Sequence, residues 1–157
     1  MSFARLIQRF KDSLADSQNE PRQQHDQLGL ATAAVLLEIA YADGVLTPAE
    51  ETDLVEYLRG RFQLDDEMVR ELIKAADEIR TRTIDHFALT SFIRKNAPLG
   101  ERIEIVKAMW RMVYSDGKLT DYEGYLVRKL ADLLGLEHHV MIEAKVSVLQ
   151  DLQLSSS

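Results

Sequence analysis

Two short acidic segments carry the residue types in this sequence that could do chemistry. The first, Leu37–Glu50, reads LEIAYADGVLTPAE, and the second, Trp110–Glu123, reads WRMVYSDGKLTDYE. In each segment an aspartate directly precedes a glycine, and a glutamate follows that glycine six positions later. The second half of an EF-hand calcium loop has the same spacing. The candidate ligands of a divalent cation are therefore four carboxylates: Asp43, Glu50, Asp116 and Glu123.

The first half of such a calcium loop is missing from both segments. Where the pattern needs two further acids, the sequence has Ile39 and Tyr41 in one segment and Met112 and Tyr114 in the other. Neither loop alone supplies the roughly six to eight oxygen ligands that calcium prefers. Two loops brought together would offer four carboxylates and several loop carbonyls. This donor set suits a hard divalent cation and does not distinguish calcium, magnesium and zinc.

A purely structural interpretation explains the same residues. The glycine of each segment can adopt the positive φ that ends a helix. Thr47 with Glu50, and Thr120 with Glu123, then match the capping box, in which a threonine and a glutamate three positions later each accept a backbone N–H of the other. The sequence leaves the capping role and the cation site open.

The two segments are also copies of each other. Tyr41 and Tyr114 are 73 positions apart, and so are Asp43 and Asp116. Six of the ten positions in residues 41–50 are identical to those in 114–123, and an expected helix of similar pattern follows each copy. Repetition at a fixed spacing is typical of a duplicated structural unit. We therefore expect a duplicated three-helix unit, with the two buried helices packed about a pseudo-twofold axis.

The whole chain reads as all-helical. Only three of its 157 residues are proline, and no segment alternates apolar and polar residues for long. Eight helices are expected, over about residues 3–17, 28–42, 48–59, 66–80, 85–95, 98–115, 121–134 and 138–150. The expected organisation is an N-terminal helix with a polar linker (1–27), repeat one (about 28–80), a connecting helix (about 83–96), repeat two (about 98–150) and a flexible tail (151–157).

Composition narrows the function classes. The absence of cysteine excludes disulfides and thiolate chemistry and suits a reducing compartment, so we expect a cytoplasmic protein. A net charge of -7 opposes binding to nucleic acid. The histidines, His25, His86, His138 and His139, lie in no recognised catalytic or zinc-binding pattern. A binding protein is therefore expected, with no catalytic residues.

An apolar stripe in the first expected helix offers another contact surface. It consists of Phe3, Leu6, Ile7, Phe10 and Leu14, flanked by Arg5, Arg9 and Lys11. Such a stripe is typical of a helix that packs on its own core. It also suits an anionic membrane surface, contacted through residues 3–14, or the groove of a partner.

A basic cluster surrounds the fifth expected helix. Its members are Arg80, Arg82, Arg94, Lys95 and Arg102. Clusters of this kind are usually solvated, and the alternative is an anionic partner such as a phosphate-bearing ligand.

The motif Y-[AS]-D-G-x-L-T-x-x-E, present twice, resembles the signature of the TerB-like tellurite-resistance family. A similar domain occurs in membrane-anchored DnaJ-like co-chaperones. The resemblance covers about Leu28–Leu149 and does not extend to Met1–Gln27. It implies an all-α duplicated fold and a bacterial stress role in the cytoplasm or at the inner membrane.

In that family the acidic positions are proposed as a metal-binding or partner-binding surface, and here they are Asp43, Glu50, Asp116 and Glu123. Two functions follow as hypotheses. The first is a module that responds to a divalent cation. The second is a metal-independent scaffold or adaptor for a protein partner.

Overall fold

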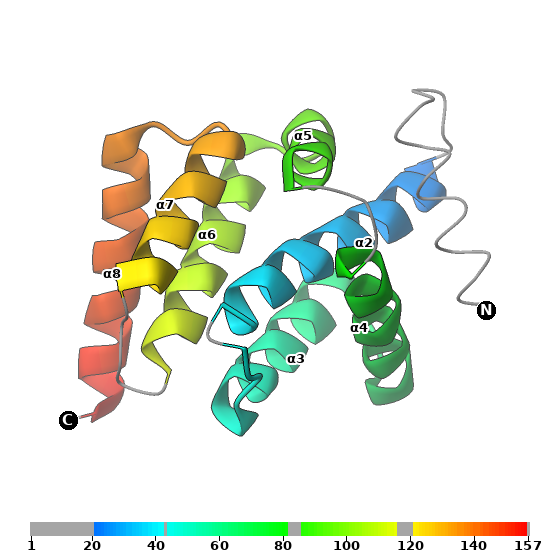
Figure 1. Cartoon of the computed structure of the whole chain (residues 1–157), viewed down its shortest axis with the longest axis horizontal. Coiled ribbons are helices and arrows are strands. Elements are labelled where there is room, and N and C mark those ends of the chain that lie inside the picture. The colour runs from blue at the N-terminus through cyan, green and yellow to red at the C-terminus, as the bar shows by residue number, and fades with distance from the viewer. Residues whose placement is uncertain (1–20, 43, 82–85, 116–120, 157) are drawn as a thin grey trace.

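The computed structural model describes residues 21–42, 44–81, 86–115 and 121–156, with the side chains of 21–26, 86 and 154–156 left out. These ranges form seven helices and contain no strand (Figure 1). The helices are α2 (Pro21–Ala40), α3 (Pro48–Phe62), α4 (Asp66–Arg80), α5 (His86–Asn96), α6 (Leu99–Tyr114), α7 (Asp121–Leu133) and α8 (His138–Ser156). The predicted all-α class is confirmed, and the helix expected at residues 3–17 lies outside the described residues.

Helices α2 and α6 form the centre of the molecule. From Leu30 to Ala40 every side chain except Glu38 is buried, as expected for a helix that is apolar nearly all round. Helix α2 contacts α3, α4, α5 and α6, while α6 also contacts α3, α7 and α8. The buried side chains of these two helices form the middle of the apolar core, on which the outer helices pack.

Local sequence explains where the outer helices start and stop. Asp65 caps α4 by accepting the Met68 N–H at 2.8 Å, so α4 begins at Asp66 as predicted. Helix α7 ends in a Schellman turn at Gly135, which has a φ of 83°, and the Leu136 N–H donates to the Ala131 carbonyl. Local hydrogen bonds therefore define the start of α4 and the end of α7.

Three predicted boundaries differ from the structure by three residues or more. Helix α2 begins at Pro21, so much of the polar linker expected at residues 18–27 is helical. Proline is favoured in a first turn, and Gln27 and Leu28 are already buried. Helix α3 continues to Phe62 because that ring is buried. Helix α8 extends to Ser156 rather than ending near Gln150.

Contacts beyond the expected end explain the length of α8. Asp151 pairs with Arg111 of α6 at 3.4 Å, and Leu152 is half-buried against the core. The helix therefore keeps packing through Leu152, inside the segment that was expected to form a flexible tail.

Candidate functional site

The first Asp-Gly loop joins α2 to α3. Gly44 has a φ of 90°, and its N–H donates to the Tyr41 carbonyl at 2.9 Å, so the chain turns where the sequence predicts. The capping box is present: Thr47 Oγ1 accepts the Glu50 N–H at 3.2 Å, and Glu50 Oε1 accepts the Thr47 N–H at 3.1 Å. The structural role predicted for these two residues is confirmed in the first copy.

The four predicted ligands are only partly placed. Asp43 and Asp116 lie outside the described residues, as does the rest of the second loop, residues 116–120. Glu50 and Glu123 both lie in the first turn of a helix, α3 and α7 respectively, and they are the charged residues that are buried in the described ranges. Those ranges hold no cluster of three or more histidine or acidic side chains suited to a metal ion.

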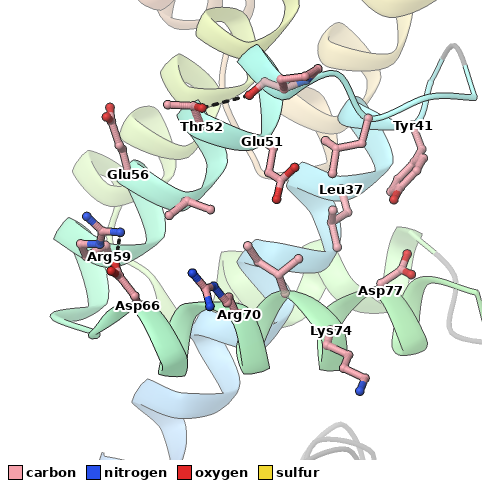
Figure 2. Close-up of a pocket in the computed structure, with 14 residues that line it drawn as sticks. Leu37, Tyr41, Glu51, Thr52, Glu56, Arg59, Asp66, Arg70, Lys74 and Asp77 are labelled. Atoms are coloured by element: carbon pink, nitrogen blue, oxygen red, sulfur yellow. Dashed lines mark hydrogen bonds and ion pairs between the residues drawn. The ribbon is translucent and has the colours of Figure 1, made fainter.

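A groove of about 600 Å³ runs between α3 and α4, with α2 behind it (Figure 2). Its floor is formed by apolar side chains that are partly buried: Tyr41, Leu46, Val55 and Ile73, together with the deeper Leu37. The first Asp-Gly loop closes one end of the groove, since Tyr41, Leu46 and Pro48 come from it or border it. The loop that was predicted to bind an ion is therefore also a wall of an open groove.

Charged side chains form the rim of the groove. Arg59 of α3 pairs with Asp66 of α4 at one end. Along the sides, Glu51 points from α3 toward the space between the helices, and Arg70 reaches toward it from α4 (Figure 2). Both are exposed, and neither has an ion-pair partner among the described residues. The groove thus offers opposite charges on its two walls.

At the end of the groove bordered by the first Asp-Gly loop, Arg80 contacts two of the lining residues. Its guanidinium lies over the Tyr41 ring, 4.4 Å from the centroid, and donates to Asp77 Oδ1 at 2.9 Å. It also lies 4.0 Å from Glu38. Arg80 therefore orients the tyrosine of the first motif and does not contribute to the basic face predicted around the fifth helix.

The second copy has a larger residue at the position of Leu37. Trp110 stands 73 positions later, is buried, and stacks on Tyr114 with ring centroids 6.1 Å apart. The Lys145 ammonium lies 5.2 Å from the Trp110 ring centroid. The second copy therefore has a buried aromatic ring at the position where the first copy has Leu37.

A polar seam joins α3 to α6 on the side away from the groove. Arg61 pairs with Glu101, and burial raises the pKa of the Tyr57 phenol far above its usual range, with Glu101 adding to the effect. Burial also raises the pKa of Asp53, although Arg111 opposes the shift. This seam connects α3 of the first copy to α6 of the second.

The histidines show no catalytic arrangement where they are described. His138 and His139 are exposed at the start of α8, and His139 Nδ1 lies 3.4 Å from Glu137. The side chains of His25 and His86 are outside the described residues.

The motifs in the sequence do not indicate the α4 wall of the groove. Arg70 and Ile73 lie three positions apart on a strongly amphipathic helix, which gives the pair a shared face. The half-buried Ile73 beside Arg70, which has no ion pair among the described residues, indicates a groove. The sequence does not show this exposure, because it depends on where the neighbouring helices lie.

Comparison with known proteins supports the resemblance. A family model described as tellurite resistance protein TerB matches residues 29–146, which is most of the chain. No curated protein and no solved structure shows a significant match. Among the described helices, none combines the length and apolar content needed to cross a bilayer. TerB is not a known enzyme family. The chain belongs to the TerB family of tellurite resistance proteins.

Proposed function

We propose that this protein is a non-enzymatic binding module of the tellurite-resistance context, and that it holds an amphipathic helical segment of a partner protein in the groove between α3 and α4. The observation that carries this proposal is the apolar floor of Leu46, Val55 and Ile73 left open between charged walls. Amphipathic helices bind such grooves through apolar residues spaced three and four apart.

The charges of the walls specify the partner further. Glu51 on one wall and Arg70 on the other lack partners among the described residues, so a bound helix gains from a base on one flank and an acid on the other. Exposed pairs of this kind each contribute only about 0.2 to 1 kcal/mol, so they set orientation while the apolar stripe supplies affinity.

A site-specific photo-cross-linker tests this proposal in cells. One chain carries the cross-linker at position 51 in the groove, and a control chain carries it at position 128, which is exposed on α7. We expect a partner segment captured at position 51 and absent at position 128. The captured segment is then synthesised and titrated with the purified protein.

Charge reversals decide whether the groove holds that segment. Glu51→Arg or Arg70→Glu alone should weaken binding about three-fold to five-fold while leaving the melting temperature within about 2 °C. Equal capture at both positions, or affinity that neither reversal changes, contradicts the proposed site.

A divalent cation is a second candidate ligand, favoured by the spacing that both motifs share, an Asp-Gly pair followed by a glutamate six positions after the glycine. Glu50 and Glu123 are buried at the same place in the two copies, and each already has an interaction in the fold, which for Glu50 includes the capping box. We propose Asp43, Glu50, Asp116 and Glu123 as the ligands. Thermal melts in calcium, magnesium, manganese or zinc against a chelator test this, because a ligand of the folded state at about 100 times its Kd adds about 2.7 kcal/mol.

The ion hypothesis fails under either of two outcomes. One is a midpoint that no ion moves. The other is a shift that survives Asp43→Asn combined with Asp116→Asn.

The packing supports a pseudo-twofold relation between the copies. The contact of α2 with α4 recurs as that of α6 with α8, and the contact of α2 with α3 recurs as that of α6 with α7. In this arrangement each Asp-Gly loop joins the same two helices of its copy. Because the first loop also closes the groove, an ion bound there would change the affinity of the partner segment. Titration of that segment with and without the ion measures the coupling.

A further inference from the structure

Two arginines from different helices meet at one glycine. Arg94 lies in the last turn of α5, Arg102 lies in the first turn of α6, and Gly135 lies between α7 and α8. A Cβ placed on Gly135 would lie 2.8 Å from Arg94 Nε and 2.8 Å from Arg102 Nη1. The two guanidinium groups therefore share the space that the missing side chain of Gly135 leaves.

The position of Arg102 is fixed by backbone contacts. Its Nε–H donates to the Ala97 carbonyl at 3.1 Å, and its Nη1–H donates to the Leu134 carbonyl at 2.7 Å. These carbonyls directly follow the ends of α5 and α7, where helix dipoles concentrate negative charge. Arg102 is thus held in place by the fold, with its other terminal nitrogen unused by these bonds.

Arg94 has no such explanation. Its side chain is exposed, and no carboxylate of the described residues lies within 4.0 Å of either guanidinium. Glu101, which precedes Arg102 in the sequence, pairs with Arg61 instead. Two like charges on either side of one Cβ position repel each other, and an anion between them removes that repulsion.

We propose that Arg94 and Arg102 form a binding site for a phosphate group, either free phosphate or a phosphate monoester. The planar fork of a guanidinium matches two phosphate oxygens, and Arg102 is already immobilised, so little side-chain entropy is lost on binding. The site lies at the end of the molecule where α5 meets α6 and α7 turns into α8, at the top of Figure 1 and away from the groove between α3 and α4. It is therefore independent of the proposed partner groove.

Titration of the full chain with inorganic phosphate at constant ionic strength, balanced with chloride, tests the site. The readout is the pair of Nε–H resonances of Arg94 and Arg102 in proton–nitrogen spectra. We expect both to shift and to saturate together. A parallel titration with O-phosphoserine separates the sources: tighter binding of the ester indicates a phosphorylated ligand, and equal binding indicates the free ion.

Matched variants make the test decisive. Arg94→Gln should weaken phosphate binding about tenfold or more, and Arg94→Lys should weaken it less, because the charge remains while the fork is lost. Arg128→Gln removes another exposed arginine, on α7, that has no ion pair among the described residues, and it should leave the affinity unchanged. Shifts that never saturate, affinity that survives Arg94→Gln, or an equal loss in Arg128→Gln overturns the proposal.

Discussion

The capping box at the start of α3 predicts a measurable and coupled effect on stability. Thr47→Ala removes the hydroxyl that accepts the Glu50 N–H at 3.2 Å. Loss of a threonine cap costs about 0.5 to 2 kcal/mol. Glu50→Ala removes the acceptor of the Thr47 N–H at 3.1 Å and leaves that amide unpaired, which costs about 1 to 3 kcal/mol. Each kcal/mol lowers the melting temperature of a chain of this size by about 2 to 4 °C.

The two bonds should not act independently. Each residue positions the other, so the double variant should cost less than the sum of the singles, with a coupling of about 0.5 kcal/mol or more. Urea unfolding followed by far-ultraviolet circular dichroism measures all three free energies of unfolding. Thr52→Ala is the control, because the exposed Thr52 hydroxyl donates to the Pro48 carbonyl at 3.0 Å on the same helix and caps nothing.

Two results would refute this reasoning. The first is a Thr47→Ala variant that loses no more free energy of unfolding than Thr52→Ala, since the cap would then contribute nothing. The second is strict additivity of Thr47→Ala and Glu50→Ala, since the reciprocal unit would then not exist.

Three further changes have defined signs. Thr32→Val replaces a fully buried hydroxyl that has no hydrogen-bond partner among the described residues, so the free energy of unfolding should rise by about 1 kcal/mol. A loss of that size in urea unfolding would contradict the unpaired hydroxyl. Trp110→Leu places the residue of the first copy at this buried position of the second. It should lower the free energy of unfolding by about 2 to 4 kcal/mol, scaled from the about 3 to 5 kcal/mol that truncation of a large aromatic residue to alanine costs. A loss under about 1 kcal/mol would show that the indole is not packed. Burial raises the pKa of Asp53 in the folded state above 3.8, so the folded state binds this proton more tightly than the unfolded state does. Asp53 therefore lowers the free energy of unfolding as the pH rises from its unfolded pKa to its folded pKa. The gain in free energy of unfolding from Asp53→Asn should be larger at pH 7 than at pH 4, and an equal gain at both would contradict this prediction.

The helices that could be predicted well are those with local signals at both ends. Helix α4 has Asp65 as its cap and Arg80 in its last turn, and its predicted range matches the structure. The start of α2 and the end of α8 depend instead on tertiary contacts. Gln27 is buried and Asp151 reaches Arg111, neither of which is readable from a polar stretch of sequence. The ranges predicted for both helices were therefore too short, because they ended where the sequence becomes polar.

The candidate site divides in the same way. The motif identified Thr47 and Glu50 because a capping box is a local arrangement, and it identified the family because the pattern occurs twice. The groove between α3 and α4 could not be predicted, since its walls come from helices whose separation depends on residues at their crossing.

The cap and the cation site make different predictions for one substitution. A carboxylate has two oxygens and about four acceptor sites, so the bond from Glu50 Oε1 to the Thr47 N–H leaves capacity for a metal. Glu50→Gln keeps a carbonyl acceptor for that N–H but removes the charge that a divalent cation needs. If Glu50 only caps α3, this variant should melt within about 2 °C of the parent in chelator and in every ion. If Glu50 also binds a cation, the melting temperatures should agree in chelator and separate when the ion is added, and Thr52→Ala should show no such divergence.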